Sequence, residues 1–157
     1  MEQLKLPKEV VRKLRSVAEE AGVSLEDFLL EAVLSGADPP ARAKTYVEAA
    51  AELLADAEEE LKVGDLRQAG EKVWGSVALA VKAYAYWREG LRLSSHGELW
   101  RYKDVLAREL GDWVRDAWMH ATAMYVNFYE GWATREDVEK ALVLAKKFVE
   151  AVKAVIK

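Results

Sequence analysis

The chain has 157 residues, of which 52% are apolar and 32% charged, and its formal net charge is −4. This balance is typical of a soluble globular protein, and the length suits one domain of roughly 100–120 residues with a small additional module. The absence of cysteine excludes thiol catalysis, disulfides and thiolate metal sites, and two histidines leave little for a zinc site, so we expect no metal and no cofactor.

The lengths of the apolar runs predict where in the cell the protein is found. No apolar run approaches the ~18 residues of a membrane span, and the N-terminus has no signal-peptide core, which predicts a cytoplasmic protein without a membrane partner. Asn and Gln are scarce beside abundant Glu, Lys and Arg, a composition typical of a thermophilic source.

The first part of the chain predicts a short extended segment followed by two helices. Pro7 disfavours helix in the residue before it and suits the first turn of the helix after it. Apolar residues at three- and four-residue intervals predict a helix over 8–21, with Gly22 as its C-terminal cap. Ser24 caps a second short helix, with Asp27 three residues further on.

The clearest boundary is Gly36-Ala37-Asp38-Pro39-Pro40, which divides the chain into an N-terminal module, residues 1–36, and a main domain, residues 37–157. No stretch alternates with period two for more than four residues, so the fold class is all-α. We expect an antiparallel helical bundle with a small N-terminal helical hairpin. In the main domain the sequence predicts a helix from the prolines to Gly64 and a helix from Asp65 to about Glu89. It also predicts a capping box of Ser95 with Glu98, a kink or break at Gly111-Asp112, and a last helix opened by Thr134 and Asp137.

The helix after Asp65 is the predicted centre of the bundle, because Lys82 is its only formally charged residue between Val73 and Trp87. A narrow polar stripe on this helix has two interpretations: a solvent-facing side, or a phosphate site. Lys82 has apolar neighbours and therefore needs an anion or a carboxylate. We favour a carboxylate at the bundle edge. The stripe comprises Lys72, Gly75, Ser76, Lys82 and Tyr86, and the candidate ligand-binding residues are Lys72, Ser76, Lys82 and His96.

A second candidate site is Arg115-Asp116-Ala117-Trp118-Met119-His120, which resembles the signature of HEPN-domain ribonucleases. That likeness implies that Arg115 and His120 of two chains meet in one cleft, with His as general acid or base and Arg holding phosphate. Asp116 precedes His120 by one helical turn and is expected to orient the imidazole. Positions five apart diverge by about 140° on a regular helix, so a kink or a dimer must unite the pair. The alternative is a solvated arginine and a partly buried histidine.

The six tryptophans form a third group with the tyrosines Tyr84, Tyr86, Tyr102, Tyr125 and Tyr129. Together with neighbouring arginines they offer surfaces on which bases stack, but at helical spacing aromatic residues more often fill a core or a dimer interface, which is the interpretation we favour.

Residues 1–36 resemble a ribbon-helix-helix module, in which two chains pair strands that enter the DNA major groove. The likeness rests on Leu4-Lys5-Leu6-Pro7, a basic helix and Gly22-Val23-Ser24. It implies DNA contacts by Gln3, Lys5 and Arg12. The second helix, however, is acidic at Glu26, Asp27 and Glu31, and the simpler interpretation is a helical hairpin that packs on the bundle.

From about residue 37 to the end, the chain resembles the archaeal PaREP family, type one, of HEPN-like helical proteins. The resemblance implies an antiparallel bundle that self-associates, and it carries no established activity. The family has His two residues before the last matching block, where this chain has Tyr125. The matching blocks are Gly64-Asp65-Leu66-Arg67-Gln68-Ala69, Glu71-Lys72-Val73-Trp74-Gly75, Val81-Lys82-Ala83-Tyr84-Ala85, His96-Gly97-Glu98-Leu99-Trp100 and Asn127-Phe128-Tyr129-Glu130.

Taken together, these patterns favour a HEPN-like homodimer that interacts with a nucleotide, RNA or a protein partner, and an enzyme is not the favoured interpretation. Two alternatives stay open. One is a metal-independent endoribonuclease that uses Arg115 and His120, and the other is a DNA-binding protein that uses residues 1–36.

Overall fold

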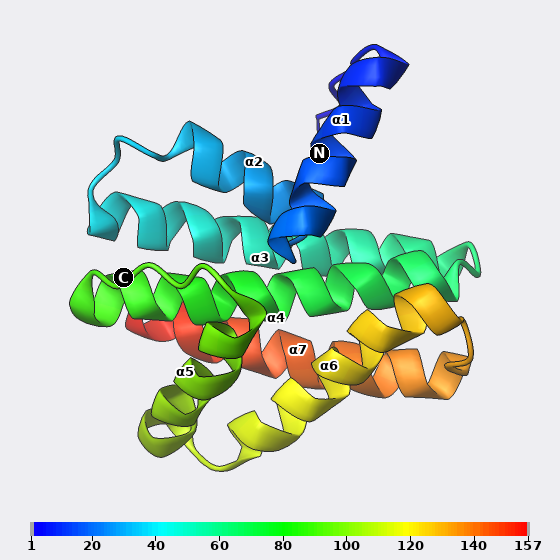
Figure 1. Cartoon of the computed structure of the whole chain (residues 1–157). Coiled ribbons are helices and arrows are strands. Elements are labelled where there is room, and N and C mark those ends of the chain that lie inside the picture. The colour runs from blue at the N-terminus through cyan, green and yellow to red at the C-terminus, as the bar shows by residue number, and fades with distance from the viewer. Residues whose placement is uncertain (1, 157) are drawn as a thin grey trace.

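The computed structural model describes residues 2–156, which form seven helices and no strand (Figure 1). The all-α class and the separate N-terminal helix pair agree with the prediction. The helices are α1 (Lys8–Ala21), α2 (Leu25–Val33), α3 (Pro39–Lys62), α4 (Leu66–Glu89), α5 (His96–Leu110), α6 (Trp113–Glu130) and α7 (Arg135–Val155).

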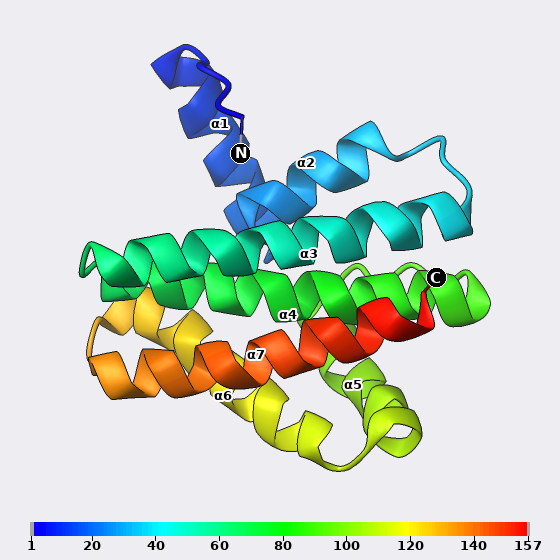
Figure 2. The ribbon, with the colours of Figure 1, turned by 180° about the vertical axis from the view of Figure 1, so that it is seen from behind.

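Helix α4 is the centre of the bundle. It lies antiparallel beside α3, and α6 and α7 cover its other sides (Figures 1 and 2). From Val73 to Tyr86 every residue of α4 is buried, which confirms that the nearly uncharged segment is a core helix. Helix α3 presents Ala43, Ala50 and Ala57, all fully buried, at seven-residue intervals, and such small side chains allow two helix backbones to approach closely.

Most helix starts follow the predicted caps. The side chains of Ser24, Asp38 and Asp65 each accept a hydrogen bond from the backbone N–H three residues on, and Thr134 with Asp137 forms a complete capping box. The predicted box at Ser95 is only half formed. Ser95 Oγ accepts the N–H of Glu98 at 3.1 Å. The Glu98 carboxylate, however, accepts the N–H of Ser94 at 3.0 Å and not that of Ser95. No backbone oxygen of residues 2–156 accepts the Ser94 N–H.

The predicted break at Gly111-Asp112 is confirmed, since α5 ends at Leu110 and α6 begins at Trp113. Gly111 has φ 127° and ψ 155°, a conformation that residues with a Cβ rarely adopt. A Cβ at this position would also lie 2.8 Å from the Trp113 ring. Glycine is therefore required where the chain turns from α5 into α6.

The N-terminal module, residues 2–36, packs on the bundle at one end of α1 and through α2. Helix α1 packs mainly on α2 and projects away from α3 and α4, whereas α2 lies against α4 (Figure 1). Residues 4–7, predicted to be extended, and the described residues before them form no helix or strand. Helix α2 and the adjoining end of α1 therefore attach the module to the bundle.

The tryptophans divide between the core and the surface. Trp74 and Trp118 are buried, and Trp113 is half-buried, which agrees with core filling. More than a third of each of Trp87, Trp100 and Trp132 is exposed, so these three are available to a partner.

Candidate functional site

Lys82 of α4 is buried and paired with two carboxylates of α2. Its Nζ atom lies 2.6 Å from Asp27 Oδ2 and 3.6 Å from Glu31 Oε1. Lys82 is 1% exposed and Asp27 is 3% exposed, so this ion pair is shielded from water. The N-terminal module therefore supplies the carboxylate that the sequence predicts as the partner of Lys82. We call Asp27, Glu31, Lys82 and their neighbour Arg92 the Lys82 cluster.

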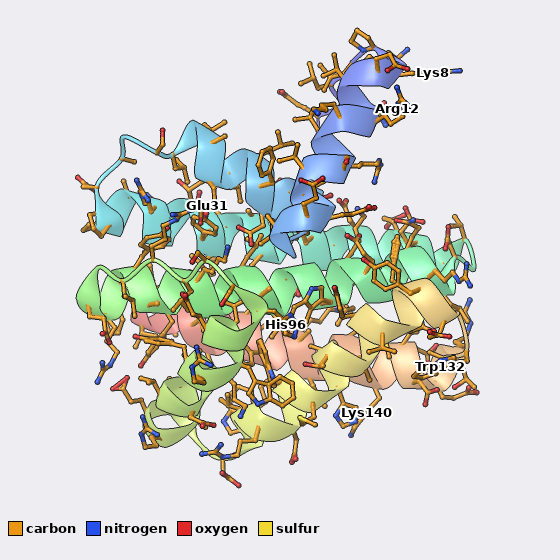
Figure 3. The ribbon with its side chains drawn as sticks, in the orientation of Figure 1. Lys8, Arg12, Glu31, His96, Trp132 and Lys140 are labelled. Atoms are coloured by element: carbon orange, nitrogen blue, oxygen red, sulfur yellow. The ribbon has the colours of Figure 1, made fainter. Side chains whose placement is uncertain are left out.

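Further polar groups extend the Lys82 cluster. Arg92 Nε donates to Glu31 Oε2 at 3.0 Å, and Glu31 lies on α2, where Figure 3 labels it. Burial raises the pKa of Asp27 despite the neighbouring Lys82 ammonium. Burial alone would also raise the pKa of Glu31, but the Tyr46 hydroxyl, Lys82 and Arg92 together lower it below its usual range. Asp27 Oδ1 is buried without a hydrogen bond.

From Gly75 to Tyr86 the predicted polar stripe is buried, so the interpretation of the stripe as a solvent-facing side is wrong for this part of the helix. Ser76 is fully buried, and its Oγ donates to the Val73 carbonyl oxygen of its own helix at 2.7 Å. Gly75 faces α3, since a Cβ there would lie 3.3 Å from Leu53. Tyr86 is 3% exposed. The reason is that α2, α3, α6 and α7 all pack on α4, which leaves no water-facing side along this part of the helix.

A pocket of about 140 Å³ lies where the turn between α1 and α2 meets the first half of α4 and the last turns of α6. We call it the hairpin pocket. Three separate parts of the chain therefore build it. Its lining residues are Arg15, Ala18, Glu19, Gly22, Val23, Ser24, Leu25, Glu26, Gln68, Glu71, Lys72, Trp74, Tyr125, Phe128 and Tyr129.

One wall of the hairpin pocket is aromatic. The ring centroids of Trp74 and Tyr125 lie 5.4 Å apart, those of Tyr125 and Tyr129 5.6 Å apart, and those of Phe128 and Tyr129 5.3 Å apart. These spacings are typical of interacting aromatic pairs. His96, at the start of α5, lies against the same wall, 5.0 Å from Trp74 and 5.4 Å from Tyr125 (Figure 3). Burial lowers the pKa of His96, which favours a neutral imidazole.

Ionisable groups also line the hairpin pocket. Burial raises the pKa of Glu71, and the nearby Glu26 carboxylate raises it further. Lys72 Nζ lies 3.6 Å from Glu26 Oε1. Tyr129 also has a raised pKa, caused by burial, by Tyr125 and by the carboxylates of Glu19 and Glu71. The pocket thus combines aromatic rings with converging carboxylates.

Residues 45–149 of the chain, two thirds of its length, match the archaeal PaREP1/PaREP8 family. The chain belongs to this family. The match runs from within α3 to within α7, so the PaREP1/PaREP8 region supplies the α4 and α6 walls of the hairpin pocket, and residues outside the match supply the α1–α2 wall. Neither the comparison with curated proteins nor that with solved structures gives a match.

The predicted catalytic residues lie on α6 of the PaREP1/PaREP8 region but do not meet within one chain. Arg115 Nε pairs with Asp112 at 3.0 Å, and its Nη1 atom contacts Asp104. His120 Nδ1 lies 2.8 Å from the backbone carbonyl oxygen of Asp116 rather than from its carboxylate. One copy therefore holds no Arg–His catalytic pair, and convergence in a dimer remains a prediction.

The predicted DNA-binding residues lie in the N-terminal module, outside the PaREP1/PaREP8 match. Gln3 and Lys5 are exposed in the segment before α1, and Arg12 pairs with Glu9 on the part of α1 that projects from the bundle (Figure 3). Across residues 2–156, no helix has the length and apolarity to cross a membrane, and no cluster of potential metal ligands is found.

Of the four predicted ligand-binding residues, Lys72 lines the hairpin pocket and His96 lies against its aromatic wall. Ser76 and Lys82 are buried elsewhere. Sequence reasoning missed Glu71, and it named Tyr125 only as a member of the aromatic group, for which core or interface filling was favoured. The available signal was spacing, because Gln68 with Glu71 and Tyr125 with Tyr129 are three and four residues apart and so share a helix face.

Proposed function

We propose that the protein binds a nucleobase, carried by a nucleotide or by single-stranded RNA, in the hairpin pocket. The observation that carries the proposal is the contiguous aromatic wall of Trp74, Tyr125, Phe128 and Tyr129 beside a cavity. Bases of every kind stack on aromatic side chains, and each stacked base contributes about 1–3 kcal/mol of binding free energy.

The size of the pocket suits a single ring system. Its volume of about 140 Å³ is below the roughly 300–1,000 Å³ of pockets that enclose a drug-sized ligand, so a base fits and the sugar and phosphate stay outside. Gln68 offers an amide donor and acceptor, and Glu71 offers a carboxyl group. These groups give the pocket polar partners for the edge of a base.

The test compares two exposed aromatic residues, one of which lines the pocket. Tyr129 is 62% exposed and lines it, and Trp132 is 58% exposed and does not. We expect Tyr129→Ala to weaken the binding of nucleoside monophosphates and of a short single-stranded RNA by roughly five- to tenfold, as measured by calorimetry. Trp132→Ala is expected to leave both affinities unchanged.

Two outcomes would contradict the proposal. One is the absence of binding by any of the four common nucleoside monophosphates and by RNA. The other is an equal loss of affinity in Tyr129→Ala and Trp132→Ala, because that result would place the ligand outside the hairpin pocket.

Two other functions stay as predictions. An endoribonuclease would require Arg115 and His120 of two copies to form a joint site in a HEPN-like homodimer, and His120→Ala would then abolish cleavage of single-stranded RNA. DNA binding through Gln3, Lys5 and Arg12 would appear as salt-sensitive binding to duplex DNA. That binding would be lost on changing Lys5 and Arg12 to alanine.

A further inference from the structure

The hairpin pocket is lined by more negative than positive side chains. Three carboxylates line it, those of Glu19, Glu26 and Glu71, against the two cations Arg15 and Lys72. One negative charge is therefore in excess when all five groups are ionised. A phosphate inside the pocket would be repelled by such a lining, which agrees with a ligand whose phosphate stays outside, whereas a positive charge inside it would be attracted.

Within the described part of the chain, neither Glu19 nor Glu71 has an ion pair, but Glu19 is exposed to water, so Glu71 is the half-buried carboxylate without a counterion. Lys72 pairs with Glu26, and Arg15 lies near Glu71 without coming within ion-pair distance. Among residues 2–156, Glu71 has neither an ion pair within 4.0 Å nor a side-chain hydrogen bond. A half-buried carboxylate without a partner is unfavourable to folding, and an approaching cation would offset that cost.

The aromatic wall adds a second attraction for the same kind of ligand. Tyr125, Phe128 and Tyr129 present ring faces and edges next to the carboxylates. A cation over an aromatic face gains about 0.5–2 kcal/mol, more when it is desolvated, and a planar cation also stacks. Aromatic rings and an unpaired carboxylate together favour a planar ring that carries a positive charge.

We propose that the hairpin pocket selects heteroaromatic cations, such as a nucleobase alkylated on a ring nitrogen, with Glu71 as the counterion and the Tyr125–Tyr129 wall as the stacking surface. This inference rests on the proposed function, because it names the kind of base that the pocket prefers. Glu71 contacts the ring edge and accepts its N–H or C–H groups, while the neutral sugar remains at the mouth.

The test uses two isomeric nucleosides and the full-length protein. At neutral pH, 1-methyladenosine is protonated and carries a positive charge on its ring, whereas N6-methyladenosine has the same heavy atoms and is neutral. Calorimetry is expected to show at least tenfold tighter binding of 1-methyladenosine. Glu71→Gln keeps the shape of the side chain and removes its charge, so we expect the ratio of the two affinities to fall towards one.

Control measurements distinguish the charge of Glu71 from that of another pocket carboxylate, test whether the variant folds, and show which of the two proposals fails. Glu19→Gln removes an exposed carboxylate of the same pocket and is expected to change the ratio by less than threefold. Thermal unfolding of Glu71→Gln is expected to show stability equal to or above that of the wild type, because an unpaired half-buried charge is removed. Equal binding of the two nucleosides, or a preference that survives Glu71→Gln, would overturn this inference alone. Binding of neither nucleoside would overturn the proposed function as well.

Discussion

The Nζ atom of Lys82 on α4 lies 2.6 Å from Asp27 Oδ2 on α2, and both side chains are almost completely buried. This ion pair joins the N-terminal module to the PaREP1/PaREP8 region. Since α1 packs mainly on α2, the position of the whole module depends on how α2 is held against α4. The same arrangement keeps the α1–α2 turn in place as one wall of the hairpin pocket.

Lys82→Met is expected to loosen the N-terminal module. Removing one partner of a buried ion pair leaves the other charge unpaired, and the cost is about 3 kcal/mol, or roughly a hundredfold in the opening equilibrium. Hydrogen exchange followed by mass spectrometry should show faster exchange in α1 and α2, with α3, α6 and α7 little changed. Unaltered exchange in α2 would show that the ion pair does not hold the module.

A double variant provides the control for this experiment. Lys82→Met combined with Asp27→Leu replaces the ion pair by apolar side chains of similar size. Such replacements are often neutral or stabilising, so slow exchange in α2 should return. The double-mutant cycle would then show strong non-additivity, as expected of two residues in direct contact.

Glu31→Gln is expected to reduce stability in a pH-dependent manner. The folded pKa of Glu31 lies below its ordinary value of 4.5, because the Tyr46 hydroxyl, Lys82 and Arg92 outweigh the effect of burial. The stabilisation by Glu31 is therefore present above pH 4.5 and is lost as the pH falls through the folded pKa. Urea unfolding at pH 7 should show Glu31→Gln to be about 1 kcal/mol less stable than the wild type. A difference that persists at pH 3 would contradict the assignment.

His96 is expected to titrate below its ordinary pKa of 6.5, because burial against Trp74 and Tyr125 disfavours the charged imidazolium. With a lowered folded pKa, the unfolded chain binds more protons just below pH 6.5, so stability falls as the pH decreases through that region. NMR titration of the imidazole measures the pKa directly. His96→Phe should lose less stability than the wild type between pH 7 and pH 5, and equal losses would contradict the prediction.

Asn127 is expected to hold the turn from α6 into α7. Its buried Oδ1 accepts the backbone N–H of Ala133 at 2.7 Å, and the chain passes through Gly131 at φ 70° between them. Asn127→Ala leaves a buried N–H unpaired and should cost about 2 kcal/mol of unfolding free energy. Met119→Ala on the exposed side of α6 serves as the control and should change stability by less than about 0.5 kcal/mol.

The agreement between sequence and structure is closest where the interactions are local. Capping by Ser24 and Asp65 needs only a side chain and the backbone three residues further on, so these helix starts were predictable. The break at Gly111 was predictable for the same reason. The sequence places Asp27 in the first turn of α2, which is correct. Its carboxylate, however, forms an ion pair with Lys82 of α4 and does not bond to the backbone of that first turn.

The candidate site was less predictable because its parts are distant in the chain. Lys72 and His96 were identified, yet the pocket also needs Glu71, Tyr125 and the α1–α2 turn, which become neighbours only when three separate segments pack together. Helical periodicity shows which face of a helix is buried, but not which helix covers that face.

The sequence by itself determined the all-α class, the helix ends and the need of Lys82 for a carboxylate, since these depend on spacing along the chain and on the cost of burying a charge. Only the tertiary structure decided that Asp27 and Glu31 supply that carboxylate, and that the same contact between α2 and α4 encloses an aromatic pocket. The physical reason is that such contacts depend on how whole helix faces pack, and packing selects among many equally apolar surfaces.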